Sequence, residues 1–153
     1  RQLHALVKQL DSPTFVYRSY AFAGLVLFEY GSYSLSLYYF DRALKTFYDR
    51  ETQLYYDFER QLELQLYKFV CRIFLAKSRY PEAKTFAFKM LRKAWLINNL
   101  DEEMTAYDLL GKIYMELQNI TMCRYFHARM KSGEKESPEI TAMSRQEMEK
   151  EST

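Results

Sequence analysis

Residues 107–114, with the sequence YDLLGKIY, carry the pattern that decides the fold. In this segment an aromatic residue is followed, at offsets of 3, 4 and 7, by an apolar, a small and a further apolar residue. The same order occurs twice earlier, in residues 20–27 around Gly24 and in residues 67–74 around Cys71. Offsets of 3, 4 and 7 place side chains on one face of a helix. The pattern therefore predicts three related helices that each have a packing face.

A second helix is predicted after each of these segments, behind a short turn. The turn contains an aromatic or apolar residue, and three residues later comes a small one, which is Ser36, Ala83 or Cys123. Small residues at facing positions let two helices approach closely, and larger side chains fill the remaining gaps. The chain has only 4 glycines and 3 prolines in 153 residues, too few for the many tight turns of a β-sandwich or barrel. The sequence thus predicts an all-α fold of antiparallel helix pairs.

This order of residues resembles the tetratricopeptide repeat, in which aromatic, apolar and small residues of a first helix precede a small residue and further packing residues in a second. The resemblance covers residues 14–131 and implies antiparallel helix pairs stacked as a right-handed solenoid. It also implies which side chains pack the two helices of each repeat together. These repeat-packing residues are Tyr20, Gly24, Ala43, Tyr67, Cys71, Ala83, Tyr107, Gly111 and Tyr114.

The spacing of the repeats departs from the roughly 34 residues that are standard in that family. Gly24 and Cys71 are 47 residues apart, and Cys71 and Gly111 are 40 apart. The spacing of 40 is similar to the lengthened repeats of kinesin light chains and of Pins-type adaptors. The spacing of 47 implies a helical extension, which we place in residues 48–63.

The repeats define the expected segments of the chain. Residues 1–13 should be the end of a preceding helix or a linker, and residues 132–153 a polar tail or a weak helix. The expected helix pairs are residues 14–50, 51–98 and 101–131. Within them, the expected helices are 14–30, 33–47, 51–77, 81–97, 102–117 and 121–131. Gly31 should end the first helix, and Asp101 should cap the fifth.

The composition gives no sign of a membrane or a secretory route. The longest uncharged runs, residues 19–28 and 30–40, fall short of the ~20 residues that span a bilayer. The two cysteines, Cys71 and Cys123, lie among apolar neighbours and predict buried free thiols in a reducing compartment. Because no signal pattern opens the sequence, we expect a cytoplasmic fragment of a longer protein. A cytoskeletal or ciliary assembly would suit the resemblance.

The sequence contains no catalytic, cofactor-binding or metal-binding constellation that we can identify. Neither of the glycine-rich phosphate-binding patterns occurs, and neither does the H-E-x-x-H pattern of zinc sites. His4 and His127 are the only histidines, and His127 is interpreted as an interface residue. Cys71 and Cys123 occupy small-residue packing positions, with no base apparent beside them. We therefore expect a protein that is not an enzyme and has no cofactor.

In tetratricopeptide repeats the first helices line a concave groove that accepts a peptide. The resemblance implies a mixed apolar and basic groove here, with Lys68, Arg72 and Lys112 placed to bind carboxylates. The alternative is that further repeats of a longer protein cover part of this surface. The groove candidates are Arg18, Phe22, Leu25, Phe28, Lys68, Phe69, Arg72, Lys112 and Met115.

Two functions fit these patterns. The first is a scaffold or adaptor that binds other proteins, either as peptides or as subunits of a multiprotein assembly. The second is an RNA-binding repeat of the pentatricopeptide kind, which reads one base per repeat and keeps a spacing of roughly 35 residues. Spacings of 40 and 47 and a net charge of only +2 argue against nucleic acid. The basic stretch 77–93 is either a solvated helix face or a docking patch for an acidic partner.

Overall fold

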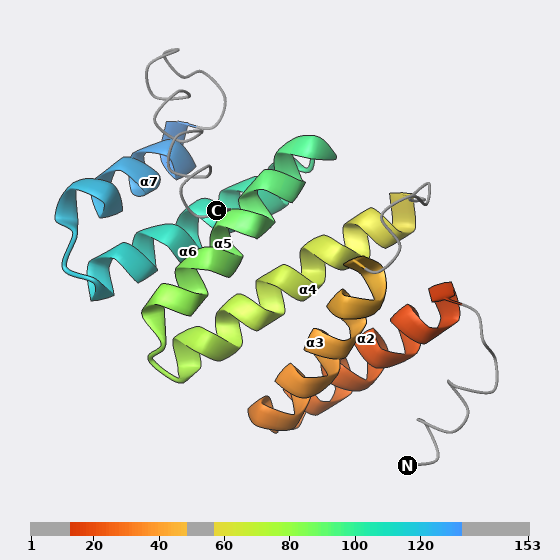
Figure 1. Cartoon of the computed structure of the whole chain (residues 1–153). Coiled ribbons are helices and arrows are strands. Elements are labelled where there is room, and N and C mark those ends of the chain that lie inside the picture. Colours follow the sequence, from red (N-terminus) through yellow and green to blue (C-terminus); the bar gives the residue numbers. More distant parts are fainter. Residues whose placement is uncertain (1–12, 49–56, 133–153) are drawn as a thin grey trace. The chain divides into compact units, whose positions relative to one another are not determined.

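The computed structural model describes residues 13–48 and 57–132, and within these ranges the regular structure is entirely helical (Figure 1). The described helices are α2 (Pro13–Glu29), α3 (Tyr33–Tyr48), α4 (Asp57–Ala76), α5 (Tyr80–Leu96), α6 (Leu100–Glu116) and α7 (Ile120–Ser132). The prediction of an all-α fold with packed helix pairs is confirmed. The predictions for residues 1–12, 49–56 and 133–153 lie outside the described residues.

The chain divides into two compact units, Arg1–Glu59 and Arg60–Thr153. The first unit contains the α2–α3 pair, and the second contains α4 from Arg60 onward, followed by α5, α6 and α7. Within the second unit α5 packs against α6, and α6 packs against α7. Aromatic rings join α4 to α5, because the Phe86 ring lies 6.2 Å from that of Tyr67 and 5.9 Å from that of Phe74.

The helix boundaries in the described ranges lie close to the predicted ones, apart from the start of α4, which is described only from Asp57. The prediction that Asp101 caps α6 is wrong. Asn99 is the N-cap, and its side chain accepts a hydrogen bond of 3.2 Å from the backbone N–H of Glu102. Asparagine and aspartate cap helices about equally well, so residue type alone does not separate the two positions. The preceding turn determines which residue is the N-cap, because its left-handed residue is Asn98 and the next residue, Asn99, has the extended backbone of an N-cap.

One type of turn ends α2, α4, α5 and α6. A residue with left-handed backbone follows each helix, with φ of 77° at Gly31, 57° at Ser78, 55° at Asn98 and 60° at Gln118. The next N–H donates to the carbonyl five residues earlier, as in the Schellman motif. These bonds are Ser32 to Leu27, Arg79 to Phe74, Asn99 to Ala94 and Asn119 to Tyr114, at 2.8–2.9 Å. The turns at Ser78, Asn98 and Gln118 follow one another at intervals of 20 residues. Two units of one helix and one turn therefore account for the 40 residues between Cys71 and Gly111.

A glycine sets the distance between α2 and α3. A Cβ atom on Gly24 would lie 2.6 Å from two ring carbons of Phe40, closer than packed carbon atoms come. The backbone oxygen of Gly24 also accepts a hydrogen bond of 2.7 Å from the Ser36 hydroxyl. Both Phe40 and Ser36 are completely buried. The absence of a side chain at Gly24 therefore lets the Phe40 ring lie directly on the backbone of α2.

The α6–α7 pair is built in the same way. A Cβ on Gly111 would lie 2.5 Å from Nε2 of His127, and His127 stands at the position that Phe40 occupies relative to Gly24. In the α4–α5 pair the corresponding residues are Cys71 and Ala87, and both are fully buried. A large side chain thus lies opposite Gly24 and opposite Gly111, and a small one lies opposite Cys71.

All nine repeat-packing residues named from the sequence are buried. The three tyrosines at the first position of the pattern are each less than a tenth exposed. The small residues Ser36, Ala83 and Cys123, which hold the same position after the small residue of each first helix, are also buried. The pattern read from the sequence therefore corresponds to a face that each pair buries between its two helices.

Replacement of Gln118 by glycine should stabilise the protein. A side chain in the left-handed region is strained, and glycine at this helix end removes the strain without removing any buried contact. We expect Gln118→Gly to raise the free energy of unfolding by about 0.5–1 kcal/mol, measured by urea denaturation. Arg92→Gly, at an exposed position inside α5, is the matched control and should lower it by about 1 kcal/mol. A loss of stability in Gln118→Gly would contradict the assignment of this turn.

Candidate interaction surface

The first helices of two consecutive pairs, α4 and α6, lie against each other in the second unit. The ammonium nitrogen of Lys68 on α4 lies 2.8 Å from Oε2 of Glu102 on α6. The side-chain amide of Gln65 donates to the same oxygen at 2.9 Å. One turn further along, the Asn99 amide donates to Oε1 of Gln61 at 3.0 Å. These contacts join residues far apart in the sequence and place equivalent helices side by side.

Lys68 differs in role from the other groove candidates of the second unit. We expected it to bind a carboxylate of a partner, but Glu102 of the same chain already supplies that carboxylate. Both side chains of this ion pair are largely buried, so breaking it would leave a charge with little access to water. Lys68 therefore connects two helices rather than offering a free positive charge.

Arg72, Lys112 and Met115 remain exposed on α4 and α6. Lys112 forms an exposed ion pair of 2.9 Å with Asp108, one turn earlier on α6. Arg72 has no carboxylate within ion-pair distance in the described part of the chain, and its guanidinium lies 5.8 Å from the centroid of the Phe69 ring. We call Arg72, Lys112 and Met115 the first-helix surface. It combines one guanidinium without a carboxylate, one paired ammonium and one apolar side chain.

The remaining groove candidates divide between the two units. Arg18 and Phe22 on α2 are exposed, whereas Leu25 and Phe28 are half-buried. Phe69 on α4 is half-buried as well. In the register of the repeats, Leu25 corresponds to Arg72 and Lys112, and Phe22 corresponds to Phe69. The structure thus places these candidates on more than one stripe of the first helices.

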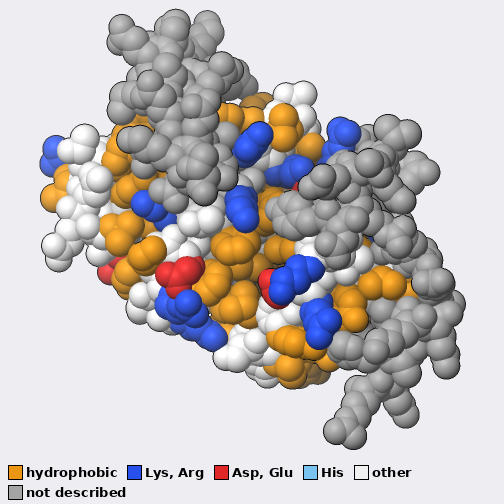
Figure 2. Space-filling model, viewed as in Figure 1, with side chains coloured by type: hydrophobic (Ala, Val, Ile, Leu, Met, Phe, Trp, Pro, Cys, Tyr) orange, Lys and Arg blue, Asp and Glu red, His pale blue; other side chains and the backbone are white. Residues whose placement is uncertain are grey.

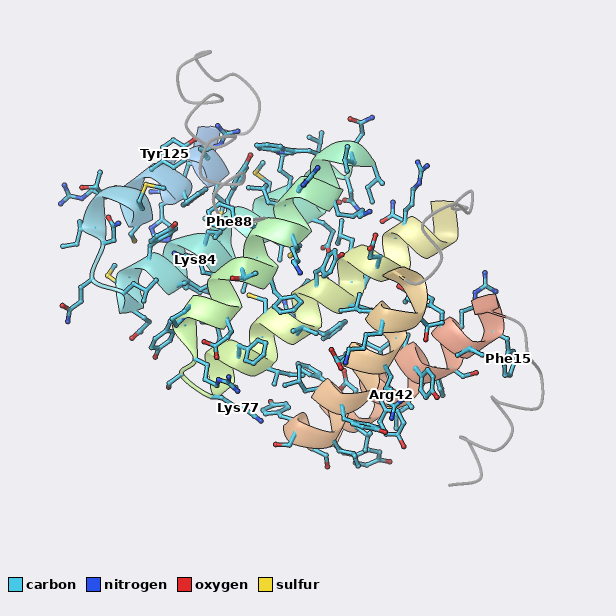
Figure 3. The ribbon with its side chains drawn as sticks, viewed as in Figure 1. Phe15, Arg42, Lys77, Lys84, Phe88 and Tyr125 are labelled. Atoms are coloured by element: carbon cyan, nitrogen blue, oxygen red, sulfur yellow. The ribbon has the colours of Figure 1, made fainter. Side chains whose placement is uncertain are left out.

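Most cations of the basic stretch 77–93 contact groups of the same unit. They meet carboxylates or aromatic rings. In the view of Figure 2, Lys and Arg side chains are scattered among hydrophobic ones. These contacts are Arg79 with Glu82, Lys93 with Glu63, Lys84 over the Tyr114 ring and Lys89 over the Phe86 ring. Arg92 is exposed. Lys77 lies at the end of α4, beside the turn into α5 (Figure 3).

Glu63 and Arg129 are buried charged residues that sequence reasoning did not single out. Glu63 accepts a hydrogen bond of 2.9 Å from the Tyr67 hydroxyl and forms a 2.5 Å ion pair with Lys93. Arg129 donates at 2.8 Å to the hydroxyl of Tyr107, which itself donates at 3.0 Å to Glu103. A glutamate four residues before each tyrosine, at 63 and 103, is the sequence signal that could have revealed both networks.

The cysteines are buried and free. The expectation that no base lies beside them is wrong for Cys123, because Nδ1 of His127 lies 3.7 Å from its sulfur. Spacing of i and i+4 on one helix brings the two side chains together. Cys123 is only 2% exposed, so the pair has little access to a substrate. The described residues contain no cluster of three or more His, Cys, Asp or Glu side chains that could hold a metal ion.

The Cys71 thiol should couple stability to alkaline pH. Burial raises its pKa from the ordinary 9.0 to about 12, although the nearby Arg72 opposes this shift. The unfolded chain then ionises first, so the contribution to stability is complete below pH 9 and is lost as the pH rises toward 12. At pH 10 the loss due to Cys71 should be about 1 kcal/mol.

Urea unfolding at pH 8 and pH 10, in the parent chain and in Cys71→Ala, measures this coupling. The parent should lose about 1 kcal/mol more than the variant between the two pH values. Equal losses would show that the folded chain accepts the thiolate at this position.

Comparison with known proteins provides no relative. No protein-family model matches the sequence, no curated protein matches it, and no solved structure matches the fold. Among the helices described, none is both long and apolar enough to cross a membrane. A functional proposal for this chain therefore depends on the contacts and exposed residues of α2 to α7.

Proposed function

We propose that this chain is a non-enzymatic scaffold that binds other proteins, built as a tetratricopeptide-like solenoid of helix pairs. The observation that carries the proposal is the side-by-side placement of α4 and α6 through Lys68 and Glu102. This contact joins equivalent helices of successive pairs. It leaves Arg72, Lys112 and Met115 exposed, and Arg72 and Lys112 occupy the same position in their repeats, directly after Cys71 and Gly111. Such a surface can accept an extended or helical peptide.

Repetition of one unit supports the solenoid part of the proposal. The turns at Ser78, Asn98 and Gln118 have the same geometry and are evenly spaced, so the backbone reverses in the same way between each helix and the next. Stacks of equal units bury a continuous core and give an extended surface along equivalent helices. The same local geometry at each joint therefore favours a regular stack over an irregular bundle.

The chemistry of the first-helix surface indicates the type of peptide that it would bind. Arg72 can form two parallel hydrogen bonds to a carboxylate, which a lysine cannot do in a fixed geometry. Met115 is a flexible apolar side chain that adapts to different partners. Lys112 is already paired with Asp108, so it adds less. A peptide with an acidic residue near an apolar one fits this surface.

A charge-reversal variant tests the proposal. Arg72→Glu combined with Met115→Lys should reduce recovery of the bound partner at least tenfold when the tagged chain is used for affinity capture from its own cells. The matched control is Arg124→Glu combined with Ala128→Lys, which changes two exposed residues of α7 in the same way. Circular dichroism should show that both variants retain the parent helix content.

Unchanged recovery by the Arg72 and Met115 variant, with loss in the α7 control, would show that the partner binds elsewhere. Recovery of RNA that weakens steeply with salt would instead favour the nucleic-acid alternative, because contacts to several phosphates release counterions.

A further inference from the structure

Two helices carry a tyrosine and an arginine one turn apart, at equivalent positions of their pairs. Tyr38 and Arg42 form this couple on α3, and Tyr125 and Arg129 form it on α7. In both couples the arginine donates to the tyrosine hydroxyl, at 2.9 Å on α3 and at 3.2 Å on α7. Each guanidinium also lies over the ring of its tyrosine, 5.1 Å and 5.8 Å from the centroid. The first and the last pair therefore contain the same local structure.

On α7 the couple is closed by the first helix of its own pair. Arg129 is only 7% exposed, and it also donates at 2.8 Å to the hydroxyl of Tyr107 on α6. That hydroxyl donates in turn to the carboxylate of Glu103 at 3.0 Å. A buried cation needs such partners, because water cannot compensate its charge. The α6–α7 pair thus supplies its arginine with a phenol and, behind it, a carboxylate.

On α3 the same couple is open. The residue of α2 that is equivalent to Glu103 is Val16, so the first helix brings no carboxylate at this position. Arg42, which Figure 3 labels on α3, is exposed, and Tyr38 is 42% exposed. In the part of the chain that the structure describes, no carboxylate lies within ion-pair distance of Arg42, and only one of its five N–H groups has an acceptor. The adjacent Asp41 pairs with a lysine one turn later.

Leu35 continues this exposed surface along α3. It lies one turn before Tyr38 and is 49% exposed. Offsets of 3 and 7 place the three side chains on one face of the helix, which extends over roughly 10 Å. We call Leu35, Tyr38 and Arg42 the α3 face. Tyrosine and arginine are the residue types on which binding energy concentrates at protein interfaces.

Stacking of helix pairs leaves this face accessible. Glu82, Thr85 and Lys89 of α5 occupy the equivalent positions. Helix α5 contacts α4 through aromatic rings and packs against α6 as well, yet these three side chains are only half-buried. The face therefore points away from the neighbouring helix pairs, and a further pair in the same stack would not cover it.

We propose that the α3 face binds an acidic helix of a partner protein. A guanidinium that is held against an aromatic ring and has no carboxylate of its own is complementary to one, with which it can form two parallel hydrogen bonds. A glutamate or aspartate of the partner therefore binds Arg42. An apolar side chain seven residues away contacts Leu35, because helices that lie side by side match positions two turns apart. This site is on the second helix of its pair, so it adds to the first-helix surface.

Defined peptides test the chemistry of this site. The probes are alanine-based helical peptides of about 20 residues that carry leucine and glutamate seven residues apart, in either order. In each control peptide glutamine replaces the glutamate. We expect the parent chain to bind the better glutamate peptide at least fivefold more tightly than its control, measured by fluorescence anisotropy at low salt. Arg42→Glu should abolish this preference.

The matched control is Arg72→Glu, which makes the same change of charge on the first-helix surface and should keep the preference. Circular dichroism should show the parent helix content in both variants. Equal affinity of the parent chain for the glutamate and glutamine peptides would overturn the proposal. An equal loss in the two variants would also overturn it, because the binding would then depend on net charge alone.

A benzophenone amino acid in place of Leu35 identifies the occupant by photo-crosslinking. In the cells of origin we expect a cross-link to a partner protein, at a segment with an acidic residue seven positions from an apolar one, and at least a tenfold loss of it in Arg42→Glu. A cross-link within the purified chain would assign the face to another segment of this chain, and a cross-linked dimer would assign it to a second copy. Either result would overturn the proposal, as would the absence of any cross-linked protein.

Discussion

The close approach of two helices at a residue without a large side chain is the constraint on which the rest of the structure depends. The Phe40 ring lies on the backbone of Gly24, and the His127 ring lies on that of Gly111. Any side chain at these glycines would occupy space that the opposite ring already fills. Since interiors are packed as densely as organic crystals, such a contact narrowly limits the distance between the helices of a pair.

The turns between the helices repeat one geometry along the chain. Each ends a helix with one left-handed residue, and the next helix begins shortly after it, so the connection is short and has a single geometry. The two turns between α4 and α6, at Ser78 and Asn98, then bring these helices into contact through Lys68 and Glu102. The exposed first-helix surface is a consequence of that contact, because it is the side of α4 and α6 that no described helix of the second unit covers.

Sequence reasoning could predict the packed faces because their pattern is local and is repeated. Gly24, Cys71 and Gly111 identify one another by their neighbours at fixed offsets, and all three are buried as the pattern requires. The turns could be predicted from the same repeat, but the residue in each turn that adopts the left-handed conformation could not. Ser78 and Gln118 adopt the conformation that glycine adopts at position 31, and nothing in their own chemistry distinguishes them from helical residues. The candidate site could likewise be predicted only in part. Lys68 and Arg72 lie one helical turn apart and have the same charge, yet only the packing of α6 brings Glu102 within 2.8 Å of Lys68.

In each helix pair, the residue at the position of Gly24 on the first helix and the residue that faces it on the second helix fill the same space between the helices. A double-mutant cycle that gives the first pair the side chains of the second, Gly24→Cys with Phe40→Ala, measures this most directly. The single changes should cost about 1–3 and about 3–5 kcal/mol of unfolding free energy. The double variant should lose at least ~1 kcal/mol less than their sum, because the cysteine fills the space that the ring leaves. Additive losses would contradict the account.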